Sequence, residues 1–232
     1  MGAPGPVGAR DSHRGPGRLS APLPIILSVD GAHPAASVMA RCASVLAEGA
    51  LVIFPTDTLY ALGGRALDPA AARRVREVKG RPGGQPLPVV AADKEQARAL
   101  CATWPRDADR LAAAFWPGPL TIVLPAAPDV PPEVTAGTGT VAVRVPALAV
   151  TAALCAAAGP LISTSANRTG ARGPLTCAEA VEGVGAAAAI ALDAGPGSPL
   201  ASTIVDLTGE APALLRAGAV AWEDVLAVLG LH

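Results

Sequence analysis

Short apolar runs alternate with segments of helical periodicity along this chain, and that alternation limits its fold most strongly. The apolar runs predict strands at residues 23–29, 51–54, 87–90, 120–124, 141–145 and 161–162, around 190, and at 203–206 and 214–215. Apolar residues three and four apart predict helices over residues 33–47, 69–80, 93–101, 105–116, 149–158, 176–184 and 222–229. Without a long internal repeat, the pattern predicts a single α/β (α+β) domain, a twisted mixed sheet flanked by helices.

Glycine and proline are frequent, with 25 and 24 residues in a chain of 232. The other residues are mostly apolar, since 51% of the chain is hydrophobic, so the composition indicates a globular fold with many turns and a substantial core. The first 20 residues are rich in Gly, Pro and Arg. We therefore expect a disordered extension over residues 1–22 and a folded domain over residues 23–232.

Histidine and cysteine usage excludes several classes of site. The three histidines are His13, His33 and His232, which argues against a Ser/His/Asp hydrolase or a His-ligated zinc centre in the core. The four cysteines form no C-x-x-C pair and are expected to be free thiols in a reducing cytoplasm. No apolar signal core or membrane span stands out, so we expect a cytoplasmic protein without membrane contact.

The charge of the chain is almost balanced. It has 18 basic and 19 acidic side chains, which gives a formal net charge of −1. Binding of nucleic acid by bulk charge is therefore excluded. Arg73, Arg74 and Arg76 lie together on one predicted helix, and they are expected to form a solvated face, with an RNA-contacting patch as the alternative.

Two polar segments near the N-terminal half are candidates for ligand binding. Residues 55–60 read PTDTLY, in which Thr56, Asp57 and Thr58 either orient a small polar ligand or satisfy their own backbone in an Asx or Ser/Thr turn; on these residues alone the turn is favoured. Residues 79–87 read KGRPGGQPL, a glycine-rich loop with two cations. Lys79 and Arg81 suit a polyphosphate or simply complement the helix C-terminus.

Three further segments carry polar groups beside predicted strands. Residues 115–121 read FWPGPLT and are expected to form a rigid packed turn. In TVAVRVP, residues 140–146, alternation places Arg144 opposite the valines, so it must pair with a protein carboxylate or with an anionic ligand, and we favour the ligand. STSAN at residues 163–167 groups hydroxyls and an amide that are costly to bury unpaired.

Together and in this order, seven motifs resemble the YrdC family of threonylcarbamoyl-adenylate synthases. They are PTDTLYALG, KGRPGGQPL, FWPGPLTIVL, TVAVRVP, STSAN, ASTIVDL and LLRAGAV, between about Gly49 and Ala219. The resemblance implies a YrdC-like domain with a large open cleft, of the short single-domain type. It also implies a nucleotidyltransferase that converts L-threonine, bicarbonate and ATP to threonylcarbamoyl-AMP and pyrophosphate. A transferase complex would then modify a tRNA adenosine beside the anticodon, with at most weak tRNA contact by this chain.

By the same resemblance, individual residues receive roles. Threonine would be held by Thr58, Arg144, Ser163, Thr164 and Ser202. ATP would be held by Lys79, Arg81, Gln85, Thr140, Ser165, Asn167 and Arg216, of which Lys79 and Arg81 would be catalytic. Magnesium is expected on the polyphosphate, with no protein ligands identified.

Three positions depart from the family pattern. Val90 stands where a histidine is common, Ala61 where glycine is usual after the tyrosine, and Ala217 where proline follows the late arginine. The missing histidine lies near the expected threonine site and leaves open a carbamoyl-adenylating paralogue with a different substrate. An RNA-binding module is the other alternative, although only 3% of the residues are aromatic.

Overall fold

The computed structural model describes residues 2, 22–80 and 85–231. The expected disordered extension therefore lies outside the described residues except at Gly2 and Pro22, and so does Arg81. The elements in chain order are β1 (Ile25–Ser28), α1 (Ala36–Ala47), β2 (Leu51–Phe54), β3 (Ala61–Gly63), α2 (Pro69–Lys79), β4 (Val89–Val90), α3 (Lys94–Ala99), α4 (Arg106–Phe115), β5 (Leu120–Pro125), α5 (Pro132–Thr135), β6 (Thr140–Arg144), α6 (Ala149–Ala158), β7 (Leu161–Ile162), β8 (Thr164–Ser165), α7 (Cys177–Val184), η1 (Gly185–Ala187), β9 (Ala188–Asp193), β10 (Thr203–Asp206), β11 (Ala213–Arg216) and α8 (Trp222–Leu229).

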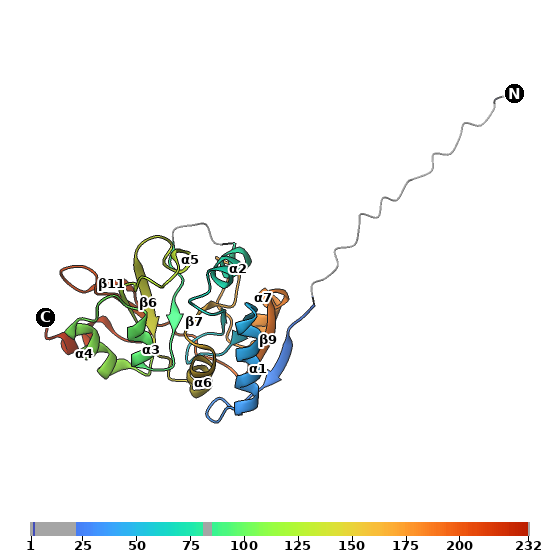
Figure 1. The fold of residues 1–232 in the computed structure, drawn as a ribbon, viewed down its shortest axis with the longest axis horizontal. Coiled ribbons are helices and arrows are strands. Elements are labelled where there is room, and N and C mark those ends of the chain that lie inside the picture. The colour runs from blue at the N-terminus through green and yellow to red at the C-terminus, as the bar shows by residue number, and fades with distance from the viewer. Residues whose placement is uncertain (1, 3–21, 81–84, 232) are drawn as a thin grey trace.

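The strands form two mixed sheets, which confirms the predicted mixed α/β class (Figure 1). The first sheet has the order β1-β9-β2-β3-β8, with parallel pairs on both sides of β9 and antiparallel pairs around β3. The second has the order β11-β10-β5-β6-β4-β7, in which β10 pairs parallel to β5 and β4 parallel to β6. The sequence analysis predicted one mixed sheet, whereas the hydrogen-bond pattern divides the strands between two sheets.

One short stretch of chain passes directly from one sheet to the other. Strands β7 and β8 follow each other with only Ser163 between them, yet β7 belongs to the second sheet and β8 to the first. The amide of Ser163 donates to the carbonyl of Pro88 at 2.8 Å, and that of Ile162 donates to the carbonyl of Gly64 at 2.9 Å. Gly63 has to be glycine, because a Cβ there would lie 1.8 Å from the carbonyl oxygen of Ile162.

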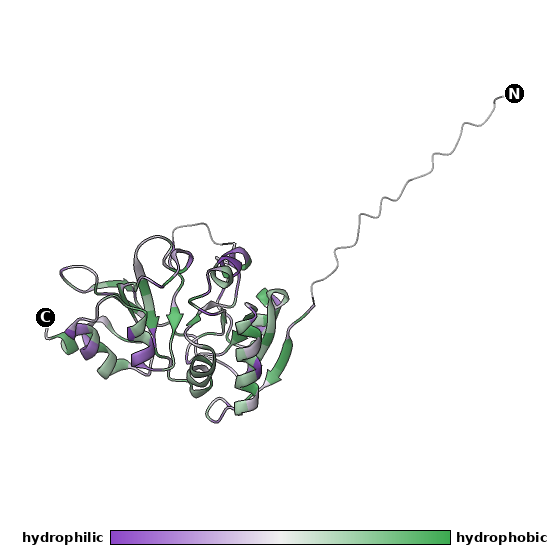
Figure 2. Ribbon diagram, in the orientation of Figure 1, coloured by the Kyte–Doolittle hydropathy of each residue, from purple (hydrophilic) through white to green (hydrophobic). Residues whose placement is uncertain are grey.

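Helices cover both sheets and complete three apolar clusters. Helices α1 and α6 pack against each other beside the first sheet, through Met39, Cys42 and Leu46 on α1 and Val150 and Leu154 on α6. Helices α4 and α8 cover the β5–β10 side of the second sheet. Figure 2 shows α2 and α4 with hydrophilic surfaces, while the interior strands are hydrophobic. No helix in the described part of the chain is long and apolar enough to cross a membrane.

Four short elements differ from the sequence expectation. The segment expected as a loop over residues 130–140 contains α5, and the polar stretch after Ile162 contains β8. Strand β3 was not predicted, and β4 is confined to Val89–Val90. Elements of two to four residues carry almost no periodicity, so their sequences do not reveal the partners that define them.

Candidate active site

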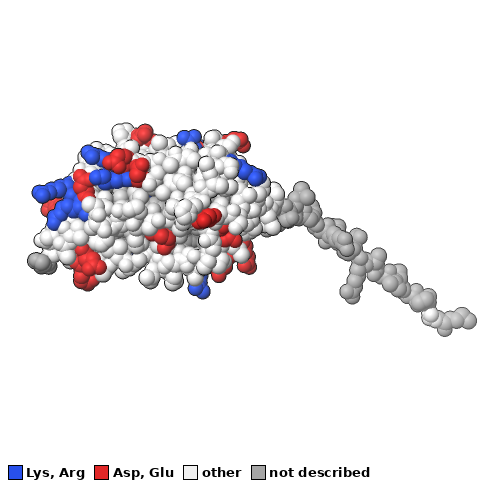
Figure 3. All heavy atoms as spheres, turned by 90° about the horizontal axis from the view of Figure 1, so that it is seen from below, with Lys and Arg blue, Asp and Glu red and all other residues white. Residues whose placement is uncertain are grey.

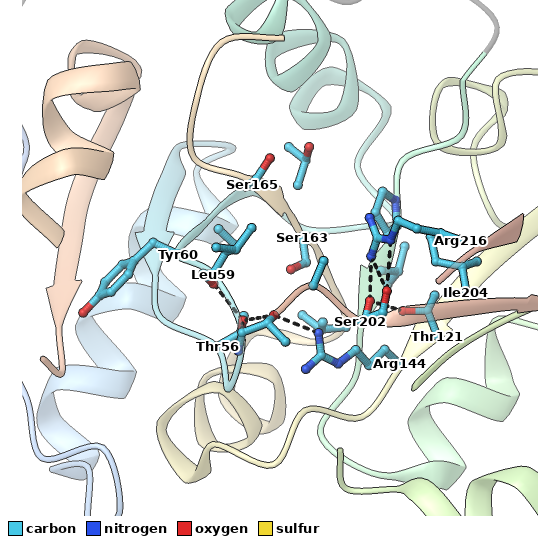
Figure 4. Close-up of a pocket in the computed structure, with 17 residues that line it drawn as sticks. Thr56, Leu59, Tyr60, Thr121, Arg144, Ser163, Ser165, Ser202, Ile204 and Arg216 are labelled. Carbon is cyan, nitrogen blue, oxygen red and sulfur yellow. Dashed lines mark hydrogen bonds between the residues drawn. The ribbon is translucent and has the colours of Figure 1, made fainter. Parts of the chain in front are cut away.

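A pocket opens near Ser163 and is lined from both sheets (Figure 4). All five residues assigned to threonine by resemblance line it, namely Thr58, Arg144, Ser163, Thr164 and Ser202. Two of the residues assigned to ATP, Ser165 and Arg216, line it as well. These seven residues come from segments up to 158 positions apart in the sequence, so the fold brings the separate motifs together. Their individual roles remain predictions.

Arg144 is directed into the site by strand alternation. On β6, Val141 and Val143 face the apolar core while Arg144 faces the pocket, as the sequence predicted. The guanidinium Nη2 is paired with Asp57 Oδ1 at 2.5 Å, Nη1 donates to Thr58 Oγ1 at 3.1 Å, and Nε donates to the Gly118 carbonyl at 2.9 Å. Of the two partners that the sequence allowed for Arg144, the protein carboxylate is present as Asp57, and the anionic ligand that we favoured stays a prediction.

Arg144 nevertheless keeps bonding capacity toward the pocket. A guanidinium carries five N–H donors, and the bonds to Gly118, Thr58 and Asp57 use three of them. Burial lowers the pKa of Arg144, and the Asp57 carboxylate opposes that change. A planar fork with free donors in a buried pocket suits a ligand carboxylate.

The turn at residues 55–60 satisfies part of its own backbone and also contributes polar side chains to the site. Thr56 Oγ1 accepts from the Thr58 amide at 3.1 Å, donates to the Leu59 carbonyl at 2.7 Å and lies 2.9 Å from Thr58 Oγ1. Thr56 thus makes the expected Ser/Thr turn. Asp57, by contrast, bonds across to Arg144, 87 positions along the chain. Thr56 forms the hydrogen bonds to the backbone of the turn, so the Asp57 carboxylate is available to pair with Arg144.

Arg216 forms the second cationic wall. Its Nε and Nη2 donate to the Ser202 carbonyl at 2.9 and 2.8 Å, and Nη2 also reaches Ser202 Oγ at 2.8 Å. Ser202 Oγ in turn lies 2.9 Å from Thr121 Oγ1. Burial lowers the pKa of Arg216, and the positive charge of Arg144 lowers it further. Two mutually repelling guanidiniums with one neighbouring carboxylate favour an anionic ligand.

Lys79 is buried away from the pocket lining. Its ammonium donates to the carbonyls of Ser165 and Asn167 at 2.6 and 2.5 Å and to Asn167 Oδ1 at 3.0 Å. These bonds tie the end of α2 to the loop after β8. Lys79 therefore holds the loop that carries Ser165 and Asn167.

The other described residues of the predicted nucleotide set are dispersed. Gln85 is exposed, and Thr140 Oγ1 bonds to Thr138 Oγ1 at 2.9 Å. Neither lines the pocket, and Asn167 lines a neighbouring hollow together with Arg168 and Arg172. The structure thus assembles the amino-acid set but brings only Ser165 and Arg216 of the described nucleotide set to the same pocket.

Apolar side chains complete the wall. Val90 and Ala61, two of the departures from the family pattern, both line the pocket and are buried. Val90 lies opposite Arg144 in the β4–β6 register. Tyr60 contributes its ring, while its hydroxyl points away and donates to the Gly195 carbonyl at 2.6 Å (Figure 4). Burial raises the pKa of Tyr60 to about 12, so its hydroxyl stays protonated.

Sequence reasoning missed the supporting roles of Asp57, Gly118 and Thr121. Asp57 was noted but favoured as a turn residue, and Gly118 was placed in a packed turn although its carbonyl also orients Arg144. Thr121 stands on β5 between Leu120 and Ile122, which both face the core. A hydroxyl alternating with buried apolar residues was the available signal.

Among the residues that the structure describes, no carboxylate lines this pocket. Within residues 2, 22–80 and 85–231, no group of three or more His, Cys, Asp or Glu side chains could hold a metal ion.

The comparisons with known proteins agree with the motifs. A model of the Sua5/YciO/YrdC family, described as "Telomere recombination", matches residues 44–218. Threonylcarbamoyl-AMP synthase of Pyrococcus abyssi is 40% identical over 190 residues, or 81% of this chain and 56% of that protein. The Bacillus subtilis enzyme of the same name is 38% identical over 83% of this chain and 56% of its own. This chain thus spans little more than half the length of those two relatives.

A shorter relative and two solved structures extend the comparison. A putative threonylcarbamoyl-AMP synthase of Mycobacterium tuberculosis is 38% identical over 79% of this chain and 85% of its own length. P. abyssi Sua5 complexed with L-threonine superposes with a TM-score of 0.84 at 38% identity, covering 89% of this chain and 61% of that one. E. coli YciO, at 23% identity and TM-score 0.79 over 86% of this chain and 98% of its own, shares the fold. The chain belongs to the Sua5/YciO/YrdC family.

Proposed function

We propose that this chain is an L-threonylcarbamoyladenylate synthase, a nucleotidyltransferase that converts L-threonine, bicarbonate and ATP to threonylcarbamoyl-AMP and pyrophosphate. The observation that carries the proposal is the pocket in which Arg144 and Arg216 face a group of hydroxyls contributed by both sheets. That combination suits an α-amino acid, because the guanidinium fork binds its carboxylate and the hydroxyls bind its polar groups. The relatives named above support the same assignment.

The proposed reaction needs no nucleophilic side chain. The amine of threonine adds to bicarbonate with loss of water, and an oxygen of the resulting carbamate attacks the α-phosphorus of ATP as pyrophosphate leaves. The chain would contribute by holding the two reactants in line and by placing positive charge where negative charge develops. Arg144 would hold the carboxylate with Thr58, Ser163, Thr164 and Ser202 around the amino acid, and Arg216 would face the phosphates.

Roles for the remaining nucleotide residues belong to the proposal. Lys79 and Arg81 would act on the phosphates, with Gln85, Thr140, Ser165 and Asn167 as further contacts. For Lys79 this requires part of its present bonding to Ser165 and Asn167 to be exchanged for phosphate oxygens. Mg²⁺ would be carried by ATP and water, because the described residues offer no ligand cluster.

The cellular setting follows from the proposed reaction. The product would pass to a transferase complex that modifies a tRNA adenosine next to the anticodon, in the cytoplasm. Little tRNA contact is expected from this chain, since Arg73, Arg74 and Arg76 all bond to the chain itself, to Glu133, Gly49 and Gln85 among others. The face in Figure 3 intermixes positive and negative side chains. An RNA-binding module is therefore disfavoured.

Val90 keeps one alternative open, a paralogue that adenylates another carbamoyl substrate. An apolar side chain in the pocket wall removes one polar partner for the amino acid. The purified chain should be incubated with ATP, Mg²⁺, bicarbonate and each of a panel of radiolabelled amino acids. Threonine-dependent pyrophosphate and adenylate support the proposal. A different preferred amino acid supports the paralogue, and no product while the B. subtilis relative works alongside rejects both.

A further inference from the structure

The acid beside Arg144 stands out among the groups that the proposed chemistry does not use. Asp57 lies behind the pocket and is not part of its lining. Its carboxylate is only 17% exposed and is held by the Arg144 guanidinium, whose side chain is 7% exposed. A carboxylate that is largely removed from water is costly unless it is paired. Its retention beside the site therefore calls for a functional explanation.

We propose that Asp57 is a positioning residue that fixes the orientation and charge of Arg144 for an amino-acid carboxylate, an inference that rests on the proposed function. Three anchors determine the plane of the guanidinium, and they come from two separate turns: Asp57 and Thr58 from the turn after β2, and Gly118 from the turn before β5. With Gly118 on Nε, Thr58 on Nη1 and Asp57 on Nη2, two of the five N–H donors remain for a ligand in the pocket that Arg144 lines.

The balance of charge in the pocket also supports a role for Asp57 in binding the amino-acid carboxylate. Among the described residues, Asp57 is the one acid within ion-pair distance of either pocket arginine. Together with Arg144 and Arg216 it leaves one excess positive charge, so the pocket still favours an anionic ligand. Without Asp57, the buried guanidinium of Arg144, whose positive charge already lowers the pKa of Arg216, would have no carboxylate partner. The amino-acid half of the site thus depends on a side chain that does not touch the amino acid.

Substitution of Asp57 provides the test. Asp57→Asn keeps the shape but removes the charge, and Asp57→Glu retains the charge on a longer arm. We expect Asp57→Asn to raise the KM and the Kd for threonine about 10- to 100-fold, with the KM for ATP within about twofold, and Asp57→Glu to recover part of the loss. Asp109→Asn is the matched control, because Asp109 pairs with Lys94 at the surface, far from this chemistry.

Three results would overturn the inference. Equal changes for threonine and ATP would indicate a general structural role, and tighter threonine binding would indicate that Asp57 competes with the ligand. A crystal structure of Asp57→Ala supplies a readout that does not depend on turnover. The inference requires Arg144 to leave Thr58 and Gly118 in that variant; an unmoved guanidinium rejects it even if the wild-type chain acts on another substrate.

Discussion

The amino-acid half and the nucleotide half of the predicted site differ in how their residues are held. Arg144 lies on a buried strand and is anchored by bonds from two other segments, with donors left toward the pocket. Lys79 lies at the end of a helix, and its ammonium bonds to the carbonyls of Ser165 and Asn167. The comparison teaches that strand register assembles the first half before any ligand arrives, whereas the second half depends on loops and helix ends.

The largest expected effect is on the KM for threonine and comes from removing the Arg144 guanidinium. Arg144→Ala should raise the KM for threonine by about 100-fold or more while the KM for ATP changes by about twofold at most, because the carboxylate fork is lost. Steady-state kinetics with each substrate varied in turn measures the two values. Arg144→Lys keeps the charge without the fork and should recover only a small part. Equal effects on both substrates would remove the distinction between the halves.

In the nucleotide half, we expect removal of the Lys79 ammonium to lower the free energy of unfolding before it affects ATP binding. Lys79→Ala removes the ammonium that donates to the carbonyls of Ser165 and Asn167, although the Ser165 carbonyl keeps the Asn167 amide as a donor. The loss should lower the free energy of unfolding by about 2–4 kcal/mol. Urea denaturation measures the loss. Lys94→Ala is the control, since Lys94 pairs with Asp109 on the surface and should cost about 0.5 kcal/mol or less. A stable Lys79→Ala that has lost only ATP binding would show that Lys79 serves the nucleotide alone.

A smaller effect is expected behind Ser202. Thr121→Val preserves shape but deletes the hydroxyl that lies 2.9 Å from Ser202 Oγ. We expect a rise of about 3- to 10-fold in the KM for threonine, because one neutral hydrogen bond is lost. Kinetics of Thr208→Val, which alters an exposed hydroxyl bonded to Asp206, provides the baseline. An unchanged threonine KM would show that Arg216 alone orients Ser202.

The smallest expected effect is on the free energy of unfolding and comes from Tyr60, which follows the turn that carries Thr58. Tyr60→Phe removes the hydrogen bond to the Gly195 carbonyl, which should cost about 1 kcal/mol near pH 7. Since the pKa of Tyr60 is raised to about 12 from an ordinary value of 10, this contribution is complete below pH 10 and is lost as the pH rises toward 12. Urea unfolding of both proteins between pH 7 and 11 should show the difference shrinking above pH 10. A constant difference would contradict the assignment.

Much of the fold could be predicted because its longer elements carry clear patterns. The strand at residues 51–54 and the helices at 149–158 and 222–229 have the predicted bounds. The division into two sheets could not be read, because β7 and β8 share one polar stretch and nothing local indicates that they pair with different neighbours. Strand β3 was missed for the same reason, since its three residues are defined by β2 and β8.

The site was predictable where a motif places one side chain on a strand. Alternation alone directs Arg144 toward the pocket, and the order of motifs gathers Thr58, Ser163 and Ser202 around it. Its ion pair with Asp57 was not predictable, because 87 residues separate the partners and Asp57 has an equally good local explanation as a turn residue. Long-range pairing is decided by tertiary packing, which a local pattern does not encode.

The crossover at Ser163 has a mechanical consequence. The backbone amides of Ile162 and Ser163 are hydrogen-bonded to the carbonyls of Gly64 and Pro88, respectively. Unfolding of one sheet would therefore strain the chain that continues into the other sheet. The two layers should therefore melt in one cooperative transition, although each has an apolar cluster of its own. Any motion of one sheet relative to the other would also displace Ser163, which lines the pocket.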